Sequence, residues 1–170
     1  MKLGHGFYER DALIVAADIL ENKLCWKDES GMVQNKVITD VEIYRGEEDK
    51  ACHACKGKTK RTNVMYMSGG LVYVYLIYGM YWMLNTVTGR EGEPQAILIR
   101  GVEGVDGPGK VGKLLKLDKS FYGEDLVKGE RIWIEDAVRK GDYEELPRVG
   151  VDYAGEWAER LWRFNLIKVK

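Results

Sequence analysis

Residues 71–88 read LVYVYLIYGMYWMLNTVT, an 18-residue stretch without a charged side chain. In its first half, apolar residues alternate with tyrosines from Val72 to Leu76, which is the period-2 pattern of a half-buried strand. Aromatic and β-branched residues, which suit a pleated surface, are frequent throughout. Gly79 lies near the middle and predicts a tight turn at about Tyr78 and Gly79. We therefore expect a β-hairpin with Tyr78 at its exposed tip.

A membrane-spanning helix is the alternative interpretation of this stretch, because 18 uncharged residues just reach the length that a bilayer requires. However, the stretch lacks the basic flanks of such spans, and the polar pair Asn85 and Thr86 lies near its end. The sequence therefore favours the hairpin, and we expect no membrane partner.

The composition is that of a globular protein. With 170 residues the chain is long enough for one well-buried domain and short for two. Hydrophobic residues make up 45% and charged residues 31%, which excludes a disordered chain. Only three prolines occur, and we find no repeat and no linker-like segment. These features predict a single domain over residues 1–170.

Charge is distributed unevenly, although the net charge is only −1. The segment 56–61, KGKTKR, has four basic residues and no acid. Four further lysines recur every three residues and would form a winding row on a helix: Lys110, Lys113, Lys116 and Lys119. Acidic residues gather elsewhere, at 47–49, 135–136 and 142–145. The pattern fits either one basic face or ordinary solvated charges, and charge alone leaves both open.

The three cysteines are an odd number and do not suggest a disulfide framework. Cys52 and Cys55 form a C-x-x-C motif, but only Cys25 and His5 remain as further soft ligands, and neither has zinc-motif spacing. A thioredoxin-like role would need a βαβ context that this region lacks. The first residues, MKLGHGFYERD, contain no apolar signal segment, so we expect an intracellular protein.

The strand predicted for residues 36–44 carries polar chemistry on one face. Alternation directs Val37, Thr39, Val41 and Ile43 to the core, and the other face carries Ile38, Asp40, Glu42 and Tyr44. Carboxylates seldom point into a core, so the second face either lies in water or lines a site. Residues 45–70 follow as a long, mostly irregular loop, and such loops are often functional.

The other segments complete the predicted fold. We expect an amphipathic helix within residues 10–23, a hairpin turn at 28–31, a strand at 95–102, a helix at 110–117 and a short strand at 132–134. Residues 148–164 read as turns and irregular structure. The fold class is α+β, as a single domain with a curved, mostly antiparallel sheet, a protruding β-hairpin and a few helices.

Several motifs, in this order, resemble those of the alkyladenine (3-methyladenine) DNA glycosylases, and together they span roughly residues 7–165. They are DVEIYRG (40–46), DKACH (49–53), TKR (59–61) with MY (65–66), YVYLIYGM (73–80), LIR (98–100), GPGK (107–110) and VGVDYAG (149–155). The chain departs from the family pattern at Ile43, where a small residue is usual, and at Thr62, where the family usually has asparagine. The Ile43 change bears on the shape of the pocket.

The resemblance implies a monofunctional glycosylase that flips an alkylated or deaminated purine out of double-stranded DNA and hydrolyses its N-glycosidic bond during base excision repair. Glu42 would be the general base, and Arg100 would orient the water with it. The base would be bound by Tyr44, His53, Tyr75 and Asn85. Tyr78 and Met65 would intercalate in the duplex, and Arg61, Lys110 and Lys113 would contact its backbone.

The same resemblance implies no cofactor and no metal, a monomer, and a location in the cytoplasm or on the nucleoid. Two other classes remain open. A non-catalytic nucleic-acid-binding module could use the same basic and aromatic residues without Glu42. A metal or thiol protein could be built on Cys52 and Cys55.

Overall fold

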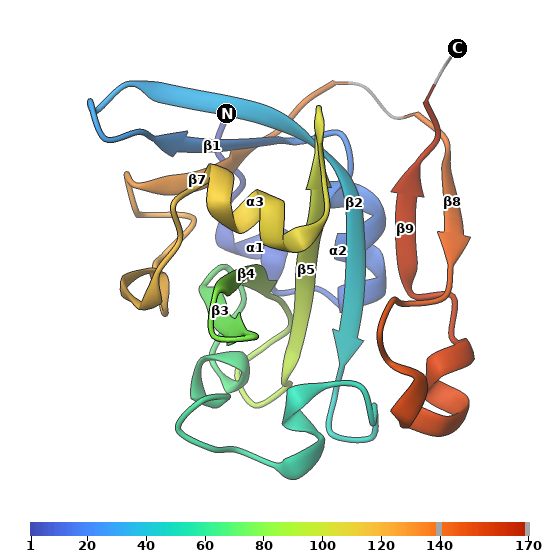
Figure 1. Ribbon diagram of the computed structural model, residues 1–170. Helices are drawn as coiled ribbons and strands as arrows, with labels where there is room; N and C mark the ends of the chain where they lie inside the picture. Colours follow the sequence, from blue (N-terminus) through green and yellow to red (C-terminus); the bar gives the residue numbers. More distant parts are fainter. Residues whose placement is uncertain (139–140, 169–170) are drawn as a thin grey trace.

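A computed structural model describes residues 1–138 and 141–168. Its strands form a nine-stranded sheet in the order β3-β4-β5-β2-β1-β7, with β6 paired to β5 and the β8–β9 pair added to β2. All strand pairs are antiparallel. In Figure 1, β1, β7 and the first part of β2 run across the view, the rest of β2 and β5 run down it, and β3 and β4 are seen nearly end-on. The sheet is therefore strongly curved, and the predicted α+β class is confirmed.

The strand bounds are β1 (Lys23–Lys27), β2 (Val33–Arg45), β3 (Val72–Ile77), β4 (Tyr81–Val87), β5 (Gln95–Val102), β6 (Val105–Asp106), β7 (Ile132–Glu135), β8 (Tyr143–Leu146) and β9 (Arg163–Leu166). The α-helices are α1 (His5–Tyr8), α2 (Ala12–Ile19) and α3 (Pro108–Leu114). Short 3₁₀ turns are η1 (His53–Lys56), η2 (Asn63–Tyr66), η3 (Lys119–Phe121) and η4 (Asp152–Glu159).

The charge-free stretch folds as the predicted hairpin. Strands β3 and β4 pair in register, with Val72 opposite Thr86 and Ile77 opposite Tyr81. Tyr78 and Gly79 both have positive φ angles, 54° and 65°, which are the values that a primed hairpin turn demands. No helix in the described ranges is long and apolar enough to cross a membrane.

Strand β2 is longer than predicted and contains a bulge. It begins at Val33 rather than at residue 36, because its first residues pair with β1 to form the first hairpin. The pairing with β5 shifts between Ile38 and Asp40, and again between Asp40 and Val41. The predicted alternation is therefore wrong before the bulge: Ile38 joins Val41 and Ile43 in the core.

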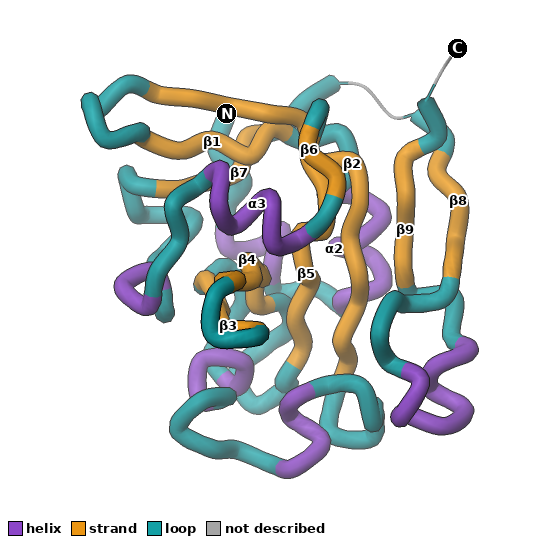
Figure 2. The backbone as a smooth tube through the Cα atoms, viewed as in Figure 1, coloured by secondary structure: helices purple, strands orange, loops and turns teal. Residues whose placement is uncertain are grey.

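Helices cover both sides of the sheet (Figure 2). The helix predicted within residues 10–23 is α2, and a separate short helix, α1, precedes it. The chain turns at Asp11, whose carboxylate accepts a hydrogen bond from the Leu13 N–H at 2.9 Å and caps α2. Helix α2 packs on β2 and β5, and α3 packs on the other side, against β4 and β5. The main core includes Val15 and Ile19 from α2 and Ile97 and Ile99 from β5.

The predicted lysine row on one helix is wrong. Helix α3 ends at Leu114, so only Lys110 and Lys113 of the four lysines lie on it. Lys116 takes a positive φ of 52° and forms an ion pair with Glu29 at 2.7 Å. Lys119 lies in η3. The turn of the chain after Leu114 thus separates the row into two parts.

The segment 148–164 is more ordered than predicted. It contains η4, and the strand β9 that follows it pairs with both β8 and the middle of β2. Phe164 of β9 is buried and stacks on Tyr143 of β8, with ring centroids 4.9 Å apart. Neither strand has a long apolar pattern of its own, because each buries few side chains. Tertiary pairing with β2 therefore decides their conformation.

Close packing of α3 on β4 gives a test of the fold. A methyl group at Gly112 would overlap the backbone carbonyl oxygen of Trp82, which cannot move away as a flexible side chain would. We expect Gly112→Ala to lower the free energy of unfolding by about 1–3 kcal/mol or more in urea denaturation. Gly6→Ala in α1 meets no atom within 4 Å and is the matched control, expected to change it by less than about 1 kcal/mol. Equal stability of both variants would contradict this packing.

Candidate active site

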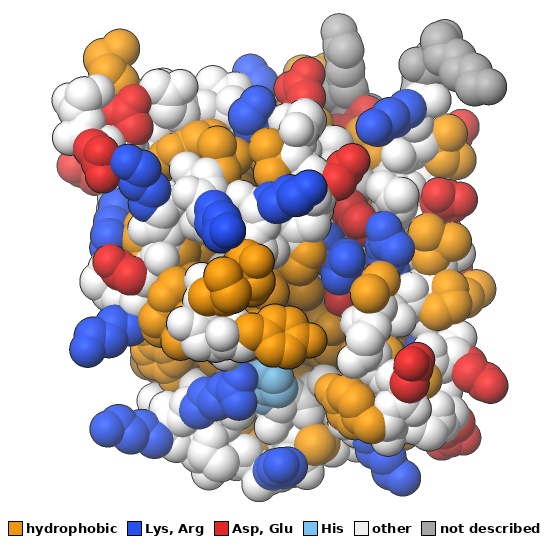
Figure 3. Space-filling view, in the orientation of Figure 1, with side chains coloured by type: hydrophobic (Ala, Val, Ile, Leu, Met, Phe, Trp, Pro, Cys, Tyr) orange, Lys and Arg blue, Asp and Glu red, His pale blue; other side chains and the backbone are white. Residues whose placement is uncertain are grey.

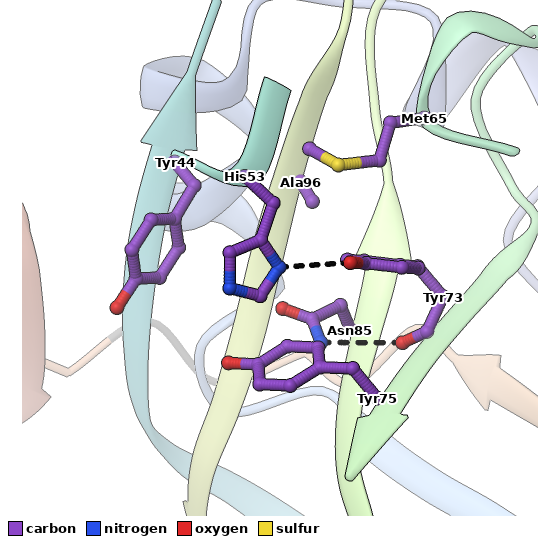
Figure 4. A pocket seen from close by; sticks show the side chains of 7 residues that line it. All are labelled: Tyr44, His53, Met65, Tyr73, Tyr75, Asn85 and Ala96. Carbon is purple, nitrogen blue, oxygen red and sulfur yellow. Dashed lines mark hydrogen bonds between the residues drawn. The ribbon is translucent and has the colours of Figure 1, made fainter. Parts of the chain in front are cut away.

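Side chains from six elements, most of them aromatic, enclose a small pocket (Figure 4). The lining residues are Tyr44 on β2, His53 on η1, Met65 on η2, Tyr73 and Tyr75 on β3, Asn85 on β4 and Ala96 on β5. Tyr73 and Tyr75 are two positions apart on one strand, so strand geometry puts them on the same face. The structure therefore brings together Tyr44, His53, Tyr75 and Asn85, as predicted.

The His53 ring lies among these tyrosines, and its electrostatics follow from burial. Its Nδ1 is 2.8 Å from the hydroxyl of Tyr73, and its ring meets that of Tyr75 edge-on at 4.5 Å between centroids. Burial, and then the positive charges of Arg61 and Lys56, lower the pKa of His53 to about 4. At neutral pH the ring is uncharged, with one donor and one acceptor nitrogen.

Asn85 and Met65 form the deeper part of the pocket. The Asn85 side-chain amide is buried and donates a hydrogen bond to the Tyr73 carbonyl at 3.2 Å, which fixes its orientation. Met65 is only 1% exposed. An intercalating side chain must protrude from the surface, so the prediction that Met65 intercalates is wrong, and Met65 is a pocket wall instead.

A fully enclosed carboxylate lies beside the pocket. Glu42 is 0% exposed, and each of its oxygens has a donor. Oε1 accepts a hydrogen bond from the Tyr44 hydroxyl at 2.9 Å, and Oε2 accepts one from the Val149 backbone N–H at 2.6 Å. The Nη1 atom of Arg100 lies 3.5 Å from Oε1 of Glu42. Glu42 and Arg100 line a second cleft that shares Tyr44, His53 and Tyr75 with the pocket.

Asp40, the other acid on this face of β2, is already engaged. Arg163 of β9 binds its carboxylate at 2.8 Å, and Arg100 Nε lies 3.7 Å away. That Nε has no hydrogen-bond partner among the described residues. Arg100 therefore lies between two carboxylates with an unused N–H. Glu42 faces the cleft, and such a carboxylate can deprotonate a water molecule or stabilise a developing cation.

The surface around the cleft is apolar in its centre and basic around it. In Figure 3, hydrophobic side chains gather over the position of β3 and β4 in Figure 1, with Lys and Arg side chains around them. At the hairpin tip Tyr78 is 88% exposed. The Arg61 guanidinium lies over the Tyr75 ring at 5.3 Å, and Lys113 lies over Tyr81 at 4.8 Å. Lys110 is exposed on α3.

The C-x-x-C cysteines offer little support for thiol chemistry. Burial raises the pKa of the Cys52 thiol to about 12, which keeps it in the unreactive thiol form. Over residues 1–138 and 141–168, the structure contains no group of three or more His, Cys, Asp or Glu side chains that could hold a metal.

Some contributors to the site were not predicted. Tyr73 follows the same alternation as Tyr75, so the strand pattern could have indicated it. Val149 contributes a backbone N–H, for which the residue type gives no signal. Tyr153 lines the cleft from η4, within a segment predicted as irregular.

Known proteins resemble this chain over nearly all of its length. The family model described as "Methylpurine-DNA glycosylase (MPG)" matches residues 6–106 and 104–169. A relative from Natranaerobius thermophilus is 39% identical, covering 98% of this chain and 96% of its own. Relatives from Legionella pneumophila (strain Lens) and Sodalis glossinidius are each 41% identical, covering 97% and 96% of this chain and 94% and 95% of their own. All three bear the name "Putative 3-methyladenine DNA glycosylase". The resemblance found in the motifs is thereby confirmed, and the chain belongs to the methylpurine-DNA glycosylase family.

Proposed function

We propose that this protein is a monofunctional DNA glycosylase that flips alkylated or deaminated purines out of double-stranded DNA and hydrolyses their N-glycosidic bonds. The observation that carries the proposal is the position of Glu42, an enclosed carboxylate at the junction of the aromatic pocket and the open cleft. A purine held in the cleft against the aromatic rings would present its sugar to this carboxylate. Family membership makes the protein a DNA glycosylase, and the geometry supports the finer assignments that follow.

A flat, extruded base would lie against the rings that the pocket shares with the adjoining cleft, because the cleft offers about 190 Å³ and the pocket about 10 Å³. Tyr44, His53 and Tyr75 provide aromatic rings on different elements, and stacking on such rings is worth about 1–3 kcal/mol per base. The neutral His53 ring can also donate or accept one hydrogen bond at the purine edge. Stacking and hydrogen bonding would together offset the cost of removing the base from the duplex, which is a few kcal/mol.

Glu42 and Arg100 would carry the chemistry. Cleavage of a glycosidic bond passes through an oxocarbenium-like sugar. Glu42 would take a proton from the attacking water and stabilise the positive charge on the sugar. Arg100, whose Nη1 lies 3.5 Å from Oε1 of Glu42, would orient that water. No lysine lines the cleft in the described part of the chain, so the nucleophile would be water and not an amine that forms a Schiff base. The reaction so assigned uses no cofactor and leaves an intact strand with an abasic site.

The hairpin and the basic residues around it would bind the duplex. Tyr78 would fill the gap that the flipped base leaves, as apolar wedges do in other DNA-bending proteins. Arg61, Lys110 and Lys113 would contact phosphates on either side of the cleft, and such contacts make affinity depend on salt. One copy of the chain carries both the pocket and the wedge, so we propose that it acts as a monomer.

Asn85 would exclude normal guanine. Its buried amide is held by the Tyr73 carbonyl and cannot rotate freely. A guanine in the pocket would bring its exocyclic amino group against this amide, at the cost of a clash or an unpaired donor. Hypoxanthine and adenine-like bases lack that amino group.

Replacing the general base tests the reaction. We expect Glu42→Gln to bind hypoxanthine-containing duplex DNA but to release the base about a hundredfold more slowly or worse, because the amide cannot take a proton. Single-turnover release of hypoxanthine is the measurement. Glu145→Gln, which changes an exposed glutamate of β8, is the control and should match wild type. A Glu42→Gln rate within a few-fold of wild type would remove Glu42 from the mechanism.

Replacing the wedge tests base flipping. Tyr78→Ser should lose more activity on a lesion that is well paired than on the same lesion in a mismatch, because the mismatched base costs less to extrude. Tyr78→Phe keeps the ring, so its ratio of the two rates should stay close to that of wild type. The measurement is the ratio of the two single-turnover rates for each variant. Equal losses on both duplexes would show that Tyr78 has a structural role only.

Replacing Asn85 tests the selectivity. Asn85→Ser shortens the side chain, so it should raise release of normal or alkylated guanine relative to hypoxanthine. Asn35→Ser, on an exposed position of β2, is the control. The two release rates are measured on duplexes that differ only in the target base. An unchanged ratio in a folded Asn85→Ser protein would place the selectivity elsewhere in the pocket.

A further inference from the structure

We propose that the buried ion pair between Asp49 and Arg148 is a positioning element that holds Glu42 and the base-binding ring of Tyr44 in one arrangement. The proposal rests on the function proposed above and adds two residues to it. Neither residue touches the space for the base, so both would act through other groups.

The pair is completely enclosed, and both terminal nitrogens of the arginine are hydrogen-bonded. Both side chains are 0% exposed. Arg148 Nη1 donates to Asp49 Oδ2 at 2.7 Å, and Nη2 donates to Oδ1 at 3.0 Å, which is the two-pronged geometry that arginine favours. Arg148 also donates to the backbone carbonyls of Ile43 and Trp157, at 2.9 and 3.0 Å. Such pairs are costly to desolvate and are weak evidence for stability, so another role explains them better.

Asp49 anchors the loop that carries His53. Its carboxylate accepts hydrogen bonds from the backbone N–H groups of Arg45 and Ala51, at 3.0 and 3.1 Å. Its own carbonyl accepts one from the N–H of Cys52, the residue before His53, at 2.9 Å. The loop between β2 and η1 is therefore fixed at the same carboxylate that binds Arg148.

Arg148 borders both hydrogen-bond donors of Glu42. The first is the Tyr44 hydroxyl: the guanidinium lies 5.0 Å from the centroid of the Tyr44 ring and 5.0 Å from that of Trp162. The second is the N–H of Val149, the residue next to Arg148 in the chain. One guanidinium thus fixes the ring that carries the first donor and the backbone that carries the second.

The remaining charged or titratable side chains that act on Glu42 come from other contacts. Besides Tyr44 on β2, they are Tyr75 on β3, Arg100 on β5 and Arg163 on β9, and Arg100 also lies beside Asp40 of β2. Of these, only Tyr44 contacts Arg148. Loss of Arg148 would therefore loosen the Tyr44 and Val149 donors and leave Arg100 in place. A carboxylate with fewer donors is less well oriented and takes up a proton more readily.

The test compares Arg148→Met and Arg148→Lys with Arg160→Met. Arg160 stacks on Trp157 at 4.7 Å and on Trp162 at 5.7 Å, but it has no contact with Glu42 or its donors, so it is a matched control. The active fraction of each protein is titrated with a duplex that contains a tetrahydrofuran abasic analogue. Single-turnover release of hypoxanthine is then measured per active molecule between pH 5 and pH 8.

We expect Arg148→Met to lower the rate per active molecule by about tenfold or more, with DNA affinity changed by less than about threefold. On acidification its rate should begin to fall at a higher pH than that of wild type. Arg148→Lys keeps a positive charge for Asp49 but not the planar guanidinium, so its rate per active molecule should lie between those of wild type and Arg148→Met. If Arg148→Met does not fold, Arg148→Lys decides. Folded variants with wild-type rates per active molecule and unshifted pH profiles would overturn the proposal. Absence of base release from wild type and Arg160→Met would instead contradict the proposed function.

Discussion

A carboxylate enclosed within the protein is the constraint on which the rest of this structure depends. Burying an ionised group without partners costs many kcal/mol, so Glu42 can exist in its position only if donors are brought to it. Two hydrogen-bond donors and a cation come from three separate segments: Tyr44 on its own strand, Val149 after β8, and Arg100 on β5. The curved sheet and its connections bring these segments together. The same segments also form the walls beside the aromatic pocket. The contacts that stabilise the Glu42 carboxylate therefore also hold the walls of the site together.

The bulge in β2 makes this arrangement possible. Before the bulge the strand buries Ile38 in the core, and after it Glu42 faces the cleft while Val41 and Ile43 stay buried. A regular strand would direct Ile38 to the same side as the carboxylates. Bulges often occur next to active sites, where they redirect side chains. Pairing with β9 then covers the bulged region and supplies Arg163, which neutralises Asp40 and leaves Glu42 as the acid at the cleft.

The sequence predicted the elements whose signals are local. Alternation and Gly79 were sufficient for the β3–β4 hairpin, and an apolar run was sufficient for β5. The bulge, the two strands β8 and β9, and the break after Leu114 depend on contacts between distant segments, so no local pattern indicated them. The same division holds at the site. Motif positions predicted Glu42, Tyr44, His53, Tyr75 and Asn85, whereas the backbone N–H of Val149 has no side-chain signal. Met65 was misplaced because a motif gives the position of a residue in the chain but not its exposure.

The central claim is that the protein hydrolyses the N-glycosidic bond of a base in DNA with an enclosed carboxylate beside an aromatic pocket, and that it does not cut the strand. The most direct test uses an end-labelled duplex with a single hypoxanthine, incubated with the wild-type protein and divided into two samples, one of which is treated with hot alkali. The account predicts free hypoxanthine in both samples, an intact strand without alkali, and a strand cut at the lesion after alkali. A strand that is bound but survives alkali would identify a non-catalytic binding module, and a strand cut before alkali would contradict water as the nucleophile.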